Sequence, residues 1–121
     1  MNYETTRTIN SETCIGVTFS VHRMSFGRRM ELTRRVRELS HRLEFSQAGA
    51  DLKDKIDAAL LAAEIDRLYV EWGLVRIDGL ELDDAPATPE SLFESGPEQL
   101  CREAIAAVKA ECGLSEEERK N

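Results

Sequence analysis

Apolar and polar positions alternate early in the chain. Between residues 17 and 22, every second side chain is apolar, beginning with Val17. A period of two is typical of a strand with one buried face. Ser25 comes shortly afterwards and can cap a helix that begins near Phe26. The sequence therefore predicts a strand over residues 17–22, followed by a helix from about residue 25 to about residue 45.

The apolar positions of this first predicted helix form one stripe. They are spaced four, three and four residues apart, at Leu32, Val36, Leu39 and Leu43. Residues 47–50 (Gln-Ala-Gly-Ala) indicate a short break between antiparallel helices. A helical hairpin is therefore expected.

The second predicted helix, about residues 51–72, has two apolar stripes instead of one. One side carries Leu52, Ile56, Ala59, Ala63 and Val70, and nearly the opposite side carries Leu61, Ile65, Leu68 and Trp72. A surface helix of a small domain normally has a single stripe. The second stripe therefore requires burial on both sides of the helix or a partner protein, and both alternatives remain open.

The period changes again after Trp72. Residues 74–77 and 80–82 predict a small hairpin around an Asp78-Gly79 turn, which can pair with the strand near residue 19. Thr88 and Pro89 mark the start of a short helix, and a last helix is expected from Pro97 to a stop at Gly113. The predicted fold class is mainly α (α+β), with a helical hairpin, C-terminal helices and a small antiparallel β element.

Composition limits the size and the class of this protein. Its 121 residues (13.6 kDa) suffice for one domain. We expect a flexible N-terminal arm over residues 1–13, a single globular domain over 14–114 and a charged tail over 115–121. There is no apolar run of 18 residues and no leader pattern, which argues against a membrane span and secretion. Three widely spaced cysteines fit a reduced, cytoplasmic protein.

The net charge of −7 is unevenly distributed. Residues 1–43 carry 8 Arg and 4 Glu, a balance of +4, whereas residues 44–121 carry 8 Lys plus Arg against 19 Asp plus Glu, a balance of −11. Such an asymmetry can indicate a nucleic-acid patch, an internal charge match or an assembly surface. Two copies could then meet basic front to acidic back, so a homo-oligomer is possible.

Seven arginines lie between Arg23 and Arg42, and they are the main signal for nucleic acid. Three of them, Arg28, Arg35 and Arg42, are spaced seven residues apart. Glu31 and Glu38 are interleaved beside them, and stacking aromatics are scarce, which argues against a phosphate-binding surface. These three arginines are therefore predicted to form a charged assembly surface.

No motif for catalysis or metal binding is recognised. The candidate side chains, each without a motif around it, are His22, His41, Cys14, Cys101 and Cys112. Cys101 and Cys112 share an apolar helix face and are expected in the core. The acidic stretch after Asp78 lacks the spacing of a calcium loop. The expectation is a protein that is not an enzyme and has no cofactor or metal.

Six segments follow one another in a recognisable order, namely Met24–Arg29, Trp72–Leu74, Ile77–Gly79, Thr88–Leu92, Gly96–Ile105 and Leu114–Asn121. In this order the chain resembles small tail assembly chaperones of long-tailed, siphophage-type bacteriophages and prophages. The resemblance covers roughly residues 17–121.

The resemblance implies a non-enzymatic role in the cytoplasm of a host bacterium. Such proteins bind the long, aggregation-prone tape measure protein, help to recruit tail tube subunits around it, and leave before the tail is complete. Many also exist in a longer form made by a ribosomal frameshift, and Arg119-Lys120-Asn121 is compatible with a slippery stretch.

The second stripe of the second helix is the predicted partner-binding face. Leu61, Ile65, Leu68 and Trp72 would hold a helical client, with Trp72 as an anchor. The same four residues could instead be core. The alternative functions are a structural adaptor or connector retained in a phage particle, and a small nucleic-acid-binding regulator that uses the Arg23–Arg42 helix.

Overall fold

A computed structural model describes residues 1–113 of the chain and confirms the α+β class, with a helical hairpin and small antiparallel sheets. In chain order the elements are β1 (Thr6–Asn10), β2 (Thr18–His22), α1 (Phe26–Ala48), α2 (Leu52–Gly73), β3 (Leu74–Asp78), β4 (Glu81–Leu82), β5 (Ala85–Pro86), α3 (Pro89–Ser95) and α4 (Glu98–Glu111).

The chain divides into two compact units. Ser25–Leu68 forms one, and residues 1–24 together with residues 69–113 form the other. The single globular domain expected over residues 14–114 stays a prediction, and its range includes the hairpin unit and part of the other unit. Residue 114 and the predicted tail over 115–121 lie outside the described residues.

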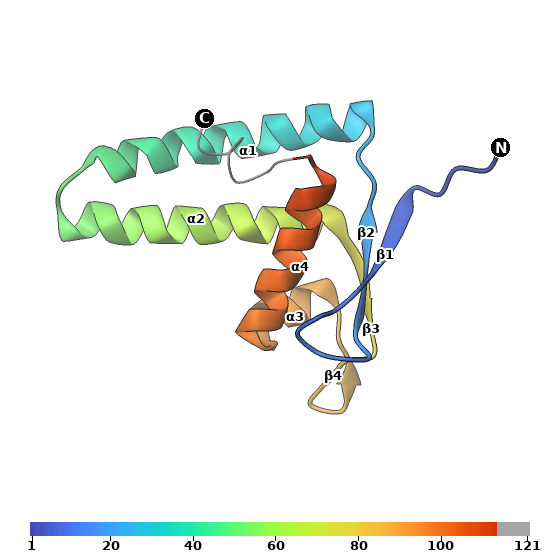
Figure 1. The fold of residues 1–121 in the computed structure, drawn as a ribbon. Helices are drawn as coiled ribbons and strands as arrows, with labels where there is room; N and C mark the ends of the chain where they lie inside the picture. The colour runs from blue at the N-terminus through green and yellow to red at the C-terminus, as the bar shows by residue number, and fades with distance from the viewer. Residues whose placement is uncertain (114–121) are drawn as a thin grey trace. The chain divides into compact units, whose positions relative to one another are not determined.

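The hairpin unit contains α1 and most of α2, which run antiparallel beside each other (Figure 1). α1 begins where the sequence predicts, because the Ser25 side chain accepts a hydrogen bond from the backbone N–H of Arg28 at 3.2 Å. Within the predicted apolar stripe, Leu32 is buried and the other three side chains are half-buried. This stripe forms the inner side of α1.

The other unit is built on an antiparallel sheet in the order β1-β2-β3. In the central strand β2, Phe19 lies opposite Ile9 of β1 and Ile77 of β3. Helix α4 packs against β2, and α3 packs against β3. Phe19 and Val21 are fully buried there, and further core side chains come from α3, from α4 and from its C-cap, namely Leu92, Leu100, Ala104, Val108 and Cys112.

The N-terminal segment differs from the prediction of a flexible arm over residues 1–13, because Thr6–Asn10 forms the edge strand β1. Backbone hydrogen bonds extend this pairing at both ends, from Ser11 N–H to Val17 O and from Arg23 N–H to Thr5 O, each at 2.8 Å. The strand is polar and largely exposed, so its order comes from the ladder with β2 and not from an apolar pattern.

The predicted hairpin around Asp78-Gly79 is wrong. β3 pairs with β2, while β4 pairs with β5 through a turn in which Asp83 and Asp84 have φ of 52° and 66°. Positive φ at two successive residues is the requirement of a type I′ turn. Gly79 serves a different purpose: a Cβ atom there would lie 2.1 Å from the carbonyl oxygen of Gly16, so only glycine allows this approach.

Candidate functional site: a groove in the helical hairpin

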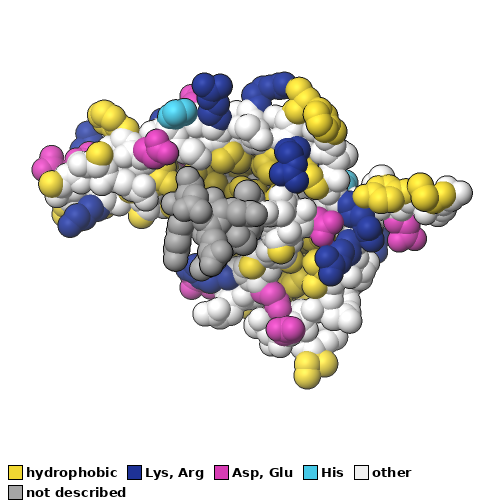
Figure 2. All heavy atoms as spheres, turned by 45° about the horizontal axis from the view of Figure 1, so that its top comes forward, with side chains coloured by type: hydrophobic (Ala, Val, Ile, Leu, Met, Phe, Trp, Pro, Cys, Tyr) yellow, Lys and Arg dark blue, Asp and Glu magenta, His cyan; other side chains and the backbone are white. Residues whose placement is uncertain are grey.

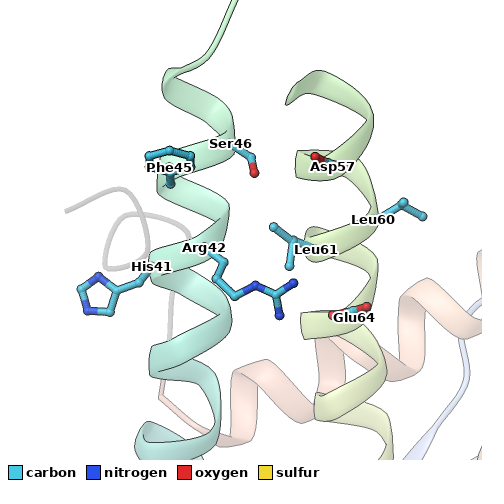
Figure 3. A pocket seen from close by; sticks show the side chains of 8 residues that line it. All are labelled: His41, Arg42, Phe45, Ser46, Asp57, Leu60, Leu61 and Glu64. Carbon is cyan, nitrogen blue, oxygen red and sulfur yellow. The ribbon is translucent and has the colours of Figure 1, made fainter. Parts of the chain in front are cut away.

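A groove of about 490 Å³ lies between the two helices of the hairpin unit, toward the turn that joins them (Figure 3). α1 contributes His41, Arg42, Phe45 and Ser46, and α2 contributes Asp57, Leu60, Leu61 and Glu64. The groove is thus built from one face of each helix, on residues that all belong to the same compact unit.

The interior of the groove is formed by short or apolar side chains. Leu61 is only 7% exposed and Ser46 is also buried, and both point into the space between the helices. Arg42 extends from α1 across this space toward α2 (Figure 3). Because Ser46 is small where the apolar stripe of α1 would place another large side chain, the helices leave a hollow here.

Two large apolar side chains among the residues that line the groove are exposed to solvent. Phe45 is 82% exposed on α1, and Leu60 is 60% exposed on α2. Figure 3 shows them outside the space between the helices, on its two sides. Neither side chain gains from burial within the hairpin, so a ligand that covered them would remove apolar surface from water.

Charged side chains of both signs line the groove. Arg42 comes from α1, and Asp57 and Glu64 come from α2. A bound helix would therefore meet the Arg42 guanidinium within the groove and carboxylates on the α2 flank. This polarity can select the direction in which a ligand lies, since the wrong orientation would bring like charges together.

The structure separates the four residues of the predicted partner-binding face. Leu61 lines the groove, Ile65 and Leu68 are half-buried on the same side of α2, and Trp72 is buried in the other unit. Their burial favours the alternative that this stripe is core. In the other stripe Leu52 and Ile56 are exposed and Val70 is buried, while Leu60, which belongs to neither stripe, is exposed beside the groove.

The three arginines of the predicted charged assembly surface do not form one open face. Arg28 is half-buried, Arg35 is paired with Glu31 at 2.6 Å, and Arg42 lines the groove. The physical reason is that a seven-residue spacing places them beside Leu32 and Leu39, on the inner side of α1.

Sequence reasoning overlooked the outward face of α1. There, Phe26, Met30, Thr33, Arg29, Arg34 and Arg37 are all exposed and surround a shallow hollow of about 370 Å³. Figure 2, turned so that the α1 side comes forward, shows basic and hydrophobic side chains next to one another. Setting aside the Leu32–Leu43 stripe and inspecting what remains at helical spacing would have revealed this face.

The remaining candidates for chemistry are dispersed. Cys101 and Cys112 are buried on α4, as predicted for core positions, and Cys14 and His22 are half-buried. Among residues 1–113, no group of three or more His, Cys, Asp or Glu side chains is arranged to hold a metal ion.

Protein-family models, curated proteins and solved structures were compared with this chain, and none matched. In the part of the chain that the structure describes, none of the helices combines the length and the apolar character needed to cross a membrane.

Proposed function

We propose that this protein is a non-enzymatic assembly chaperone that holds an amphipathic helix of a client protein in the hairpin groove. The observation that carries the proposal is the pair of exposed apolar side chains, Phe45 and Leu60, on either side of a groove with Leu61 in its interior. Recognition of a helix by an apolar groove uses apolar positions three or four residues apart on the ligand.

The groove suits a helix better than an extended strand. Its walls are helices, whose backbone hydrogen-bonding groups are already paired within each helix, so no free backbone edge is offered to a strand. Side-chain contacts must then provide the affinity. Covering one Phe or Leu side chain contributes about 1.5–3 kcal/mol, and association itself costs several kcal/mol, so Phe45 and Leu60 supply only part of the affinity and the complex should be weak and reversible. Reversible binding is what a chaperone that later leaves its client requires.

The proposed client is the tape measure protein of a long-tailed phage, and the proposed consequence is recruitment of tail tube subunits around it. Both are supported by the resemblance of residues 17–121 to tail assembly chaperones. The action takes place in the host cytoplasm, where the tape measure protein is made. In this proposal the client binds in the groove, and not on the face formed by Leu61, Ile65, Leu68 and Trp72 that the sequence predicted.

The test is co-purification of this chain with the tape measure protein encoded near its gene. We expect a complex with the unaltered chain, and at least about tenfold weaker binding for Phe45→Glu and for Leu60→Glu, because each places a charge in an apolar contact. Ile15→Glu is the matched control, since Ile15 is fully exposed in the other unit. Equal binding by all three variants would contradict the groove as the client site.

A structural adaptor would use the same groove, but unlike a chaperone it would remain in the finished particle. Mass spectrometry of purified tails distinguishes the two functions: a chaperone is absent from finished tails, whereas an adaptor is present in a fixed ratio to the tube protein.

A further inference from the structure

The outward face of α1 has a composition unlike that of the groove. Phe26 is 85% exposed and Met30 is 53% exposed, and they lie four residues apart, so their side chains adjoin on one side of the helix. Arg29, Arg34 and Arg37 surround them around the same hollow. Within residues 1–113, no acidic side chain lines this hollow.

The charge around this hollow is not neutralised nearby. Residues 26–37 contain five Arg and one Glu, and that one, Glu31, is paired with Arg35 at 2.6 Å. Among the described residues, no ion pair is formed with Arg29, Arg34 or Arg37. The first turn of α1 also has no acidic residue. Cations near a helix N-terminus oppose the helix dipole, so this arrangement works against the stability of α1.

From this pattern we infer that the outward face of α1 docks an acidic amphipathic helix of a partner protein. The partner presents apolar side chains to Phe26 and Met30, and carboxylates about one turn further along to Arg34 and Arg37. Charge complementarity identifies this occupant: three guanidinium groups that form no ion pair within residues 1–113 favour carboxylates, and two exposed apolar side chains favour an apolar surface.

Other polyanions satisfy only part of this surface. A phosphate backbone would pair with the arginines but leave Phe26 and Met30 in contact with charged groups, and the whole chain carries a net charge of −7. An anionic membrane would need a longer apolar stripe than two side chains. The inference rests on the proposed function in one respect, since it gives the same protein-binding module a second surface, separate from the groove.

The experiment uses two synthetic helical peptides with identical leucine positions, one flanked by glutamates and the other by lysines. Binding to the full chain is measured by fluorescence anisotropy over a range of salt concentrations. We expect the glutamate peptide to bind at least about tenfold more tightly than the lysine peptide, with an affinity that falls as salt rises.

Variants locate the site. Arg34→Glu should weaken binding of the glutamate peptide by about tenfold, and Met30→Gln by several-fold, while circular dichroism keeps the helical signal. Arg37→Gln removes a positive charge without adding a negative one, and should also weaken binding of the glutamate peptide. Lys53→Glu, an exposed cation of α2 outside the hollow, is the matched control and should bind normally.

Four results would overturn the inference: equal binding of both peptides, equal losses for Arg34→Glu and Lys53→Glu, tighter binding of duplex DNA or anionic vesicles at the same arginines, or self-association of the chain that Arg34→Glu abolishes. The groove variant Leu60→Glu should bind the glutamate peptide normally. If the peptide fails to bind while the client is still held in the groove, this inference falls and the proposed function stands.

Discussion

The Ser11 hydroxyl donates a hydrogen bond to the carboxylate of Glu103, and this contact joins the loop after β1 to helix α4. The same carboxylate accepts the backbone N–H groups of Glu12 at 2.7 Å and Thr13 at 3.3 Å. One glutamate therefore satisfies three donors of a loop distant in sequence. Replacing it removes several hydrogen bonds at once, two of them to otherwise unpaired amides.

Glu103 should make stability depend on pH. Burial acts to raise the pKa of Glu103, but the hydrogen bonds from Ser11, Glu12 and Thr13 outweigh it and lower the pKa below its ordinary value of 4.5. A folded-state pKa below the unfolded value means that the ionised carboxylate adds stability above about pH 4.5, and that this stability is lost as the pH falls through the folded-state pKa.

The measurement is the free energy of unfolding in urea for the unaltered chain and for Glu103→Gln, from neutral to acidic pH. The difference between the two should be largest above pH 4.5 and shrink below it. Glu44→Gln, at an exposed position of α1, should produce no comparable change. A constant difference for Glu103→Gln at every pH would show that the charge on the carboxylate is not what stabilises the loop.

Gly73 should resist substitution by alanine. A Cβ atom there would lie 2.3 Å from Cγ1 of Val108, a buried residue of α4 in the same unit. Gly73→Ala should therefore destabilise the protein by about 1–3 kcal/mol through overpacking. Gly27→Ala is the control: it is in α1 with open space around it, and should be stabilising by about 0.5–1 kcal/mol. Thermal unfolding of both variants distinguishes packing from helix propensity.

The same substitution should cost much more stability at Leu61 than at its neighbour Leu60. Leu61→Asp places an unpaired charge in the interior of the hairpin, so we expect a loss of at least about 3 kcal/mol and a reduced helical signal in circular dichroism. Leu60→Asp changes an exposed position and should cost no more than about 0.5 kcal/mol. Equal stability of the two variants would mean that the leucine at 61 is not part of the hairpin core.

Arg29 offers a test in which stability and binding move in opposite directions. Arg29→Glu replaces a cation near the N-terminus of α1 by an anion, and should raise the free energy of unfolding by about 0.5 kcal/mol. The same change should weaken binding of the glutamate peptide, because it removes one of the three arginines around the hollow. Loss of both stability and binding would indicate that Arg29 has a structural role instead.

Helix ends were predictable because their signals are local. Ser25 caps α1 by bonding an amide three residues ahead, and Thr88 with Pro89 starts α3 in a capping box completed by Ser91. Gly113 follows α4 with φ of 75°, the conformation that glycine favours after a helix. Each signal acts over a few residues, so no knowledge of the rest of the fold was required.

Strand pairing was not predictable in the same way. Asp78-Gly79 and Asp83-Asp84 both suit a tight turn. The hairpin forms at Asp83-Asp84 because β3, which ends at Asp78, pairs with β2, and β4 then pairs with β5. β1 was overlooked for a similar reason. Its residues are polar and show no apolar pattern, and the strand forms because it pairs with β2.

By itself the sequence determined the helical hairpin, the positions of the helix ends, and the presence of two apolar stripes on α2. It could not determine what covers each stripe, because the pattern within one helix does not show which other elements pack against it. The tertiary structure decided this by placing the Leu61 side of α2 toward α1, which leaves Leu60 and Phe45 exposed at the groove. An apolar side chain becomes core or binding surface according to what packs against it, and that depends on contacts between elements rather than on the pattern within one.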